Sequence, residues 1–206
     1  QPMVAGIGVN SDAKSREAMG PKAWDSARQS SAQPSHIFVV GVHRSGTTLM
    51  RHILNDCSMV ALCDETHYMG HVICTAGMRR HFRRFAPLTD PANIVRLVEH
   101  MQSAAFQRYS SFKELGWQWT WFVKTVPAEV ICNRLLASDR SEDGIFDVFM
   151  SMYADQHGAT VRGEKTPIQL RWTEELMAWY PSAKIIHMIR DPRAVHPLHE
   201  RRDDEV

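Results

Sequence analysis

Residues 36–50, with the sequence HIFVVGVHRSGTTLM, constrain the fold of this chain more than any other stretch. Four consecutive apolar residues at 37–40, two of them valines, predict a short strand that is buried on both faces. Gly41 and Gly46 then bound a short loop. After the loop, apolar residues recur at helical spacing: Leu49, Met50, Ile53 and Leu54. A strand, a glycine-bounded loop and a helix in this order have the outline of a phosphate-binding loop.

The side chains of this loop suit an anionic ligand. Backbone N–H groups at the start of the helix point toward one place, and the hydroxyls of Ser45, Thr47 and Thr48 add donors on either side of Gly46. Arg44 carries a fixed positive charge and can reach two oxygens of one phosphate. Nucleotide triphosphatases have a lysine at the position that Thr47 occupies here.

From residue 38 to residue 65, and in two later segments, the chain resembles the sulfotransferase family, and within it the tyrosylprotein and related bacterial branches. The resemblance implies that 3′-phosphoadenosine 5′-phosphosulfate is the sulfuryl donor. It also implies that the loop binds the 5′-phosphosulfate side of this donor, through Arg44, Ser45, Gly46, Thr47 and Thr48. His43 stands where these branches have a proline.

An acidic pair follows a second predicted strand at 59–63. The carboxyl ends of parallel strands are where ligands sit in an open sheet. We expect Asp64 to cap a following helix. The resemblance implies that Glu65 is the catalytic base, because the tyrosylprotein branch has its proposed base at the same separation from the loop arginine, in a matching Glu-Thr segment. A carboxylate there can take the proton of an attacking hydroxyl. His67 and His71 are alternative bases, since cytosolic family members use histidine.

Two later segments extend the resemblance. Residues 161–167 include Glu-Lys-Thr-Pro, and the resemblance implies that Lys165 neutralises charge on the bridging oxygen as the sulfuryl group leaves. Residues 183–195 combine a buried strand with an Arg-Asp-Pro-Arg loop, whose first arginine, Arg190, corresponds to the family's ligand of the donor 3′-phosphate. A serine normally follows eight residues later, but this chain has Leu198 there.

The remaining chain predicts a flexible arm and one domain. Residues 1–35 are rich in Ser, Ala, Gly, Gln and Pro and predict the flexible N-terminal arm, and residues 36–206 form the sulfotransferase-like domain. Family members continue further, so the resemblance implies that the C-terminal part of the domain is missing. We expect helices at 70–85, 92–109, 127–137, 144–157 and 168–180, the first with a basic, solvated face.

The expected fold class is α/β, in which a P-loop-like parallel sheet is flanked by helices in three layers. The strand at 36–40 should be central, and the strand at 183–189 should be its neighbour. The aromatic run at 116–122 has two interpretations. It is either a packed strand or core plug, or a wall of the acceptor pocket.

Composition excludes several classes of partner. The net charge of +1 gives no reason to expect nucleic acid or a membrane surface. No run of eighteen apolar residues occurs, so we expect no membrane segment in this chain, which favours a cytoplasmic enzyme. The cysteines show no metal-ligand spacing, and we interpret them as buried thiols. They are Cys57, Cys63, Cys74 and Cys132.

We therefore predict a sulfotransferase that moves the sulfuryl group by in-line displacement to a hydroxyl or amine of a small-molecule, peptide or carbohydrate acceptor. No metal is expected, because no acidic ligand set faces the loop as in a magnesium-dependent kinase. Two alternatives remain open. One is a P-loop nucleotide phosphotransferase, and the other is a catalytically incomplete nucleotide-binding remnant, which Leu198 favours.

Overall fold

The computed structural model describes residues 36–70, 79, 82–106 and 117–195. The predicted arm at 1–35, most of the predicted helix at 70–85, and the candidates His71 and Leu198 lie outside these residues. The described elements, in chain order, are β1 (His36–Gly41), α2 (Thr47–Asn55), β2 (Val60–Cys63), η2 (Arg83–Phe85), α4 (Pro91–Gln102), α6 (Trp117–Thr125), α7 (Ala128–Ala137), α8 (Glu142–Gln156), β3 (Val161–Lys165), η3 (Pro167–Trp172), α9 (Thr173–Trp179) and β4 (Lys184–Met188).

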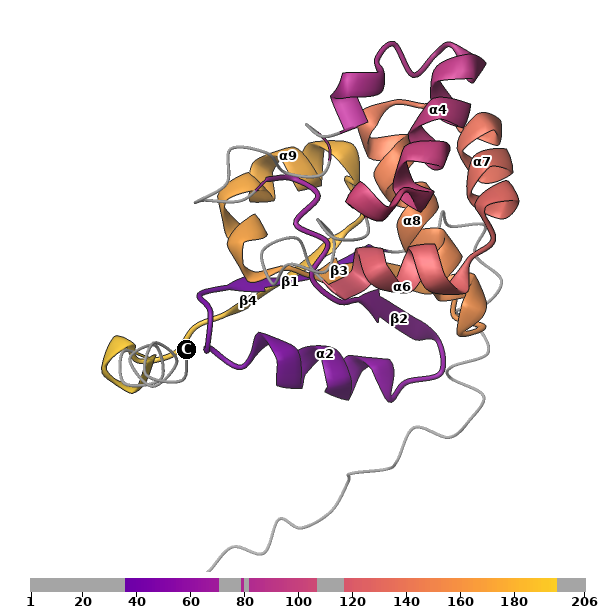
Figure 1. Cartoon of the computed structure of the whole chain (residues 1–206). Helices are drawn as coiled ribbons and strands as arrows, with labels where there is room; N and C mark the ends of the chain where they lie inside the picture. Colours follow the sequence, from indigo (N-terminus) through magenta and orange to yellow (C-terminus); the bar gives the residue numbers. More distant parts are fainter. Residues whose placement is uncertain (1–35, 71–78, 80–81, 107–116, 196–206) are drawn as a thin grey trace, which may run out of the picture. The chain divides into compact units, whose positions relative to one another are not determined.

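The described strands form one parallel sheet in the order β2-β3-β1-β4, which confirms the α/β fold class (Figure 1). β1 pairs with β3 on one side and with β4 on the other, so the predicted central strand and its predicted neighbour are both confirmed. β2 pairs with β3 rather than with β1. Because all these strands are parallel, their carboxyl ends meet at one edge of the sheet.

Helices cover both faces of this sheet (Figure 1). α2 packs on one face, against β1, β2 and β3. α6, α8 and α9 lie on the other face, where α8 contacts β2 and β3. The apolar run of β1 is buried as predicted at Phe38, Val39 and Val40, which have no exposed surface, whereas Ile37 is half-buried. β1 is therefore an interior strand of the sheet with a buried apolar run.

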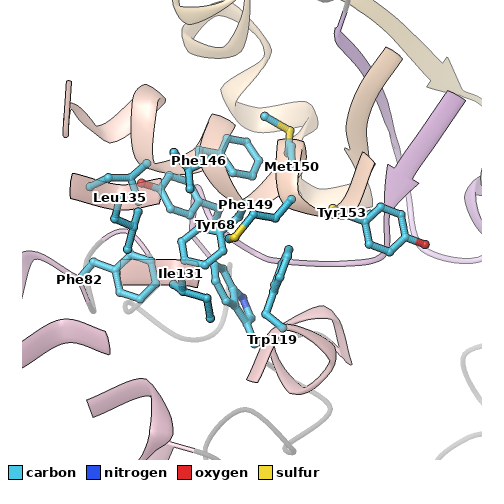
Figure 2. Close-up of a cluster of buried hydrophobic side chains, with 14 of the residues drawn as sticks. Tyr68, Phe82, Trp119, Ile131, Leu135, Phe146, Phe149, Met150 and Tyr153 are labelled. Atoms are coloured by element: carbon cyan, nitrogen blue, oxygen red, sulfur yellow. The ribbon is translucent and has the colours of Figure 1, made fainter. Parts of the chain in front are cut away.

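An aromatic core fills the layer that contains α6 and α8 (Figure 2). The rings of Tyr68 and Phe146 are parallel with centroids 4.4 Å apart, and Trp119 meets Phe149 edge to face at 4.9 Å. α8 confirms the helix expected at 144–157, and its buried residues include Ile145, Val148, Phe149, Met152 and Tyr153. Such ring pairs add to the free energy gained by burial.

Residues 117–122 of the aromatic run form part of a helix, not a strand, and residue 116 lies outside the described residues. α6 begins at Trp117, and its residues Trp119 and Phe122 are fully buried in the core. Residues three apart lie on the same side of a helix, so one face of α6 presents both rings to α8. The core-plug interpretation is confirmed for these two residues, and the strand interpretation is wrong.

Several expected helices have other boundaries. Asp90 caps α4 by accepting from Ala92 N–H at 2.9 Å, as its position before Pro91 suggests. α4 ends at Gln102, because Ser103 adopts an extended backbone; residues 104–106 are helical again, and 107–109 lie outside the described residues. The expected helix at 168–180 is divided into η3 and α9 at Trp172, whose backbone leaves the helical region.

Two described arginines of the expected helix at 70–85 form ion pairs within the domain. Arg79 Nη1 lies 2.6 Å from Glu175 Oε1, and its guanidinium stands 5.6 Å from the ring centroid of Trp179. Arg79 also pairs with Glu142, as does Arg83. Only 15% of the Arg79 side chain is exposed, so the expectation of a solvated face is wrong for Arg79.

The described cysteines differ in their exposure to solvent. Cys63 is buried as expected, whereas Cys57 is exposed in the turn after α2 and Cys132 is half-buried, so that expectation is wrong for Cys57. Cys74 lies outside the described residues.

Within the described ranges, no helix is both long enough and apolar enough to cross a membrane.

Phe149→Ala tests the aromatic core. The ring is fully buried against Trp119, Phe122 and Phe82, so its removal should lower the free energy of unfolding by about 3–5 kcal/mol. The matched control is Val130→Ala on α7, where 41% of the side chain is exposed and a change within about 0.5 kcal/mol is expected. Denaturant unfolding measures both, and equal losses in the two variants would contradict this description of the core.

Candidate functional site

Four segments that are distant in sequence meet at the carboxyl edge of the sheet. The glycine loop follows β1, the acidic pair follows β2, Lys165 ends β3, and Arg190 follows β4. The register pairs Val39 with Lys165 and Gly41 with Met188, which places the end of β3 and the exit from β4 beside the start of the loop. Arg190 joins the loop directly, since its Nη1 donates to the backbone oxygen of Arg44 at 3.1 Å. The parallel register therefore brings the sequence-predicted residues to one place.

The glycine loop has the backbone geometry of an anion cradle. Arg44 and Gly46 both have left-handed backbones, with φ of 66° and 99°. A Cβ at Gly41 would lie 2.5 Å from the backbone oxygen of Met188, so only glycine fits where β4 passes the loop. The side chains of Arg44 and Thr48 are exposed, whereas Ser45 and Thr47 are buried.

The loop retains hydrogen-bond donors that a phosphate would satisfy. Gly46 precedes the first residue of α2, and no side chain caps this helix terminus. The hydroxyl of Ser45 is buried and has no hydrogen-bond partner among the described residues. Buried donors without partners are costly, and helix N-termini favour anions. Together with the cations of Arg44 and Arg190, these groups fit the phosphate of a nucleotide donor.

A chain of alternating charges lies beside the loop. The Lys165 side chain is only 3% exposed, and its Nζ lies 2.5 Å from Glu65 Oε1 and 2.8 Å from Asp64 Oδ1. Arg51 Nη2 approaches Asp64 Oδ2 at 3.4 Å, and His67 Nε2 lies 3.3 Å from Glu65 Oε2. Lys165 is therefore the shared counter-ion of two carboxylates.

Asp64 does not cap a helix, so that expectation is wrong. Residues 64–67 have no helical structure. Asp64 N–H donates to Gln118 Oε1 at 2.9 Å, while the carboxylate lies between Lys165 and Arg51. Two cations hold this carboxylate more strongly than a capping interaction would. Sequence reasoning missed the contact of Arg51 with Asp64, although Arg51 follows the buried Thr47 by four residues and so shares its helix face.

The electrostatics of Glu65 follow from its neighbours. Burial alone would raise the pKa of this carboxyl, but the hydrogen bond with His67 and the charge of Lys165 outweigh burial and lower the pKa to about 2. Glu65 is therefore a carboxylate throughout the neutral range. Glu65 can therefore accept a proton at neutral pH without first losing one.

Comparison with known proteins shows the family to which the chain belongs. A model described as the sulfotransferase family matches residues 34–197. The chain belongs to the sulfotransferase family. This confirms the resemblance drawn from the sequence motifs. No curated protein sequence matches this sulfotransferase.

A solved structure, the sulfotransferase STF9 from Mycobacterium avium, is similar to this sulfotransferase at 13% sequence identity, with a TM-score of 0.34. The similarity covers 83% of this chain and 46% of the STF9 chain. The chain described here thus spans less than half the length of that solved chain.

Glu65→Gln tests the charge cluster without any assay of activity. Because the pKa of Glu65 lies below its ordinary 4.5, its carboxylate stabilises the fold above pH 4.5, and this contribution is lost as the pH falls through about 2. The stability advantage of the natural protein over Glu65→Gln should therefore shrink between pH 4.5 and 2, as measured by denaturant unfolding. Glu174→Gln changes an exposed carboxylate on α9 and is the matched control. An advantage of Glu65 that is independent of pH would contradict the ion-pair assignment.

Proposed function

We propose that this sulfotransferase moves a sulfuryl group from 3′-phosphoadenosine 5′-phosphosulfate to a hydroxyl or amine of a small-molecule, peptide or carbohydrate acceptor. The observation that carries the proposal is the position of the Lys165–Glu65 pair beside an anion-binding loop, at one edge of the sheet. Membership of the family supports the same reaction class.

Residues of the loop would hold the donor. Arg44, the hydroxyls of Ser45, Thr47 and Thr48, and the N–H groups that follow Gly46 surround the position for the 5′-phosphosulfate. Arg190 is exposed and has one nitrogen on the Arg44 carbonyl, so its remaining donors are available to the 3′-phosphate. When bound, the donor supplies the activated sulfuryl group.

Glu65 and Lys165 would then share the chemistry. Glu65 takes the proton of the acceptor as the acceptor oxygen or nitrogen forms its bond to sulfur. The bond from sulfur to the 5′-phosphate oxygen breaks, and its electron pair remains on that oxygen. Lys165 stabilises this developing negative charge from the end of β3. The displacement balances without a metal ion or an oxidant.

The shared counter-ion also sets the strength of the base. While Lys165 pairs with Glu65, the pKa of Glu65 lies near 2 and the carboxylate is a weak base. If Lys165 turns toward the phosphate oxygen, Glu65 loses a stabilising charge and its pKa rises. Donor binding thereby strengthens the base at the moment when the base is needed.

Arg44→Ala tests the loop. The side chain is exposed and lies outside the core, so the fold should survive. Affinity for the desulfated donor, 3′-phosphoadenosine 5′-phosphate, should fall by about 10- to 100-fold, because one charged hydrogen-bonding partner contributes about 1.5–3 kcal/mol. Calorimetry in the presence of a metal chelator measures this change. Arg134→Ala removes an arginine that pairs with Asp155 on α8 and serves as the control. Equal affinity of the two variants would contradict the assignment of Arg44.

Glu65→Gln tests the base. The substitution keeps the shape of the side chain but cannot take a proton, so kcat should fall by about 10²–10⁴-fold while affinity for the desulfated donor changes little. Transfer of radiolabel from the sulfuryl donor to a panel of hydroxyl and amine acceptors measures kcat. If the natural protein transfers no label to any acceptor, the proposed function is wrong. If Glu65→Gln stays active and His67→Gln does not, His67 is the base.

A further inference from the structure

A third acidic residue lies fully buried next to Asp64 and Glu65, and the proposed reaction does not use it. Glu164 directly precedes Lys165 on β3, is paired in register with Cys63 and has no exposed surface. Its Oε2 accepts a hydrogen bond from the hydroxyl of Thr66. Burial raises the pKa of Glu164 to about 8, so the carboxyl is neutral at pH 7 and adds no charge that competes for Lys165. A buried carboxyl is unfavourable unless its contacts compensate, which points to a role for this contact.

Thr66 is anchored through each of its polar groups. Its N–H donates to the hydroxyl of Thr166 at 3.2 Å, and its backbone oxygen accepts from the indole N–H of Trp119 at 2.6 Å. Its hydroxyl donates to Glu164 and accepts from Tyr68 N–H at 3.2 Å. Thr66 has no exposed surface. These contacts tie one residue of the turn after β2 to β3, to Thr166 and to α6.

The two neighbours of Thr66 are the proposed base and the histidine that contacts it. Glu65 precedes it and His67 follows it, and His67 has a left-handed backbone with φ of 48°. Residues other than glycine seldom adopt this conformation, and they keep it where the surrounding structure over-determines it. The turn places one oxygen of Glu65 on Lys165 and brings the other to 3.3 Å from His67 Nε2.

We infer that Glu164 and Thr66 are positioning residues. Glu164 holds Thr66, and the anchored Thr66 fixes the turn that presents Glu65 to Lys165 and to the acceptor. The inference rests on the proposed role of Glu65 as the base. A base works only within a narrow range of distances and angles, and a displacement of about 1 Å is enough to lose up to about 100-fold in rate. Glu164 and Thr66 touch neither reacting atom and act through the backbone of the turn.

The test uses two variants of Thr66 in the full chain. Thr66→Val keeps the volume and removes the hydroxyl, whereas Thr66→Ser keeps the hydroxyl. We expect kcat to fall by about 10- to 100-fold in Thr66→Val. The affinity for 3′-phosphoadenosine 5′-phosphate should be kept, and Thr66→Ser should recover most of the lost rate. Carboxyl NMR should also show the pKa of Glu65 rising from about 2 toward its ordinary 4.5 in Thr66→Val, because the contact with Lys165 loosens.

Two results would overturn the inference. One is a Thr66→Val variant with unchanged kcat and unchanged pKa of Glu65, and the other is an equal loss of rate and donor affinity that Thr66→Ser does not recover. If Thr66→Val does not fold, Glu164→Asp replaces it, because the shorter side chain withdraws the acceptor from Thr66. Glu164→Gln, which keeps a neutral acceptor of the same length, is its matched control, and the same criteria apply to this pair.

Failure of the inference and failure of the proposed function give different results. A natural protein that transfers no sulfuryl group refutes the function. The pKa of Glu65 can still be compared between Thr66→Val and Thr66→Ser, because that measurement needs no turnover. An active natural protein whose Glu65 is insensitive to Thr66 refutes the positioning role alone.

Discussion

The parallel pairing of β1 with β3 and β4 is the constraint on which the rest of the structure depends. This pairing sets Val39 beside Lys165 and Gly41 beside Met188, so the glycine loop, Lys165 and the loop that contains Arg190 emerge at the same edge. β2 joins the sheet through β3 and brings its acidic pair to that edge. The aromatic core to which α6 and α8 contribute fills the helical layer on the face of the sheet away from α2 (Figure 2). The site is thus a consequence of strand order and register.

The local parts of this arrangement could be predicted from the sequence, because they depend on neighbours in the chain. The apolar run of β1, the glycines of the loop and the cap of α4 by Asp90 are of this kind. The partners of Asp64 could not be predicted, because Lys165 is distant in sequence and only the register of β2 and β3 brings it near. The aromatic run of α6 was ambiguous for the same reason. The buried face of α6 is the one that packs against Phe149 of α8, and the aromatic residues of α6 alone do not show which element they will pack against.

The site contains two neighbouring groups of polar side chains with little exposure to solvent. Lys165 balances Asp64 and Glu65, and the neighbouring Glu164 is held as a neutral acid against Thr66. Paired buried charges contribute little net stability, since desolvation offsets much of their attraction. Their position beside the glycine loop supports the proposed role in function. In β3, Lys165 would then take part in the reaction, and the preceding residue, Glu164, would position the turn that carries Glu65.

In the proposed function, the loop after β1 and the residues at the other strand ends form one donor site. A crystal structure of the full chain with 3′-phosphoadenosine 5′-phosphate, grown without metal ions, tests it most directly. The account predicts the 5′-phosphate at the first turn of α2, within hydrogen-bonding distance of Ser45 Oγ, and the 3′-phosphate on Arg190. A nucleotide bound elsewhere on the chain, or one whose phosphates contact neither the loop nor Arg190, would contradict it.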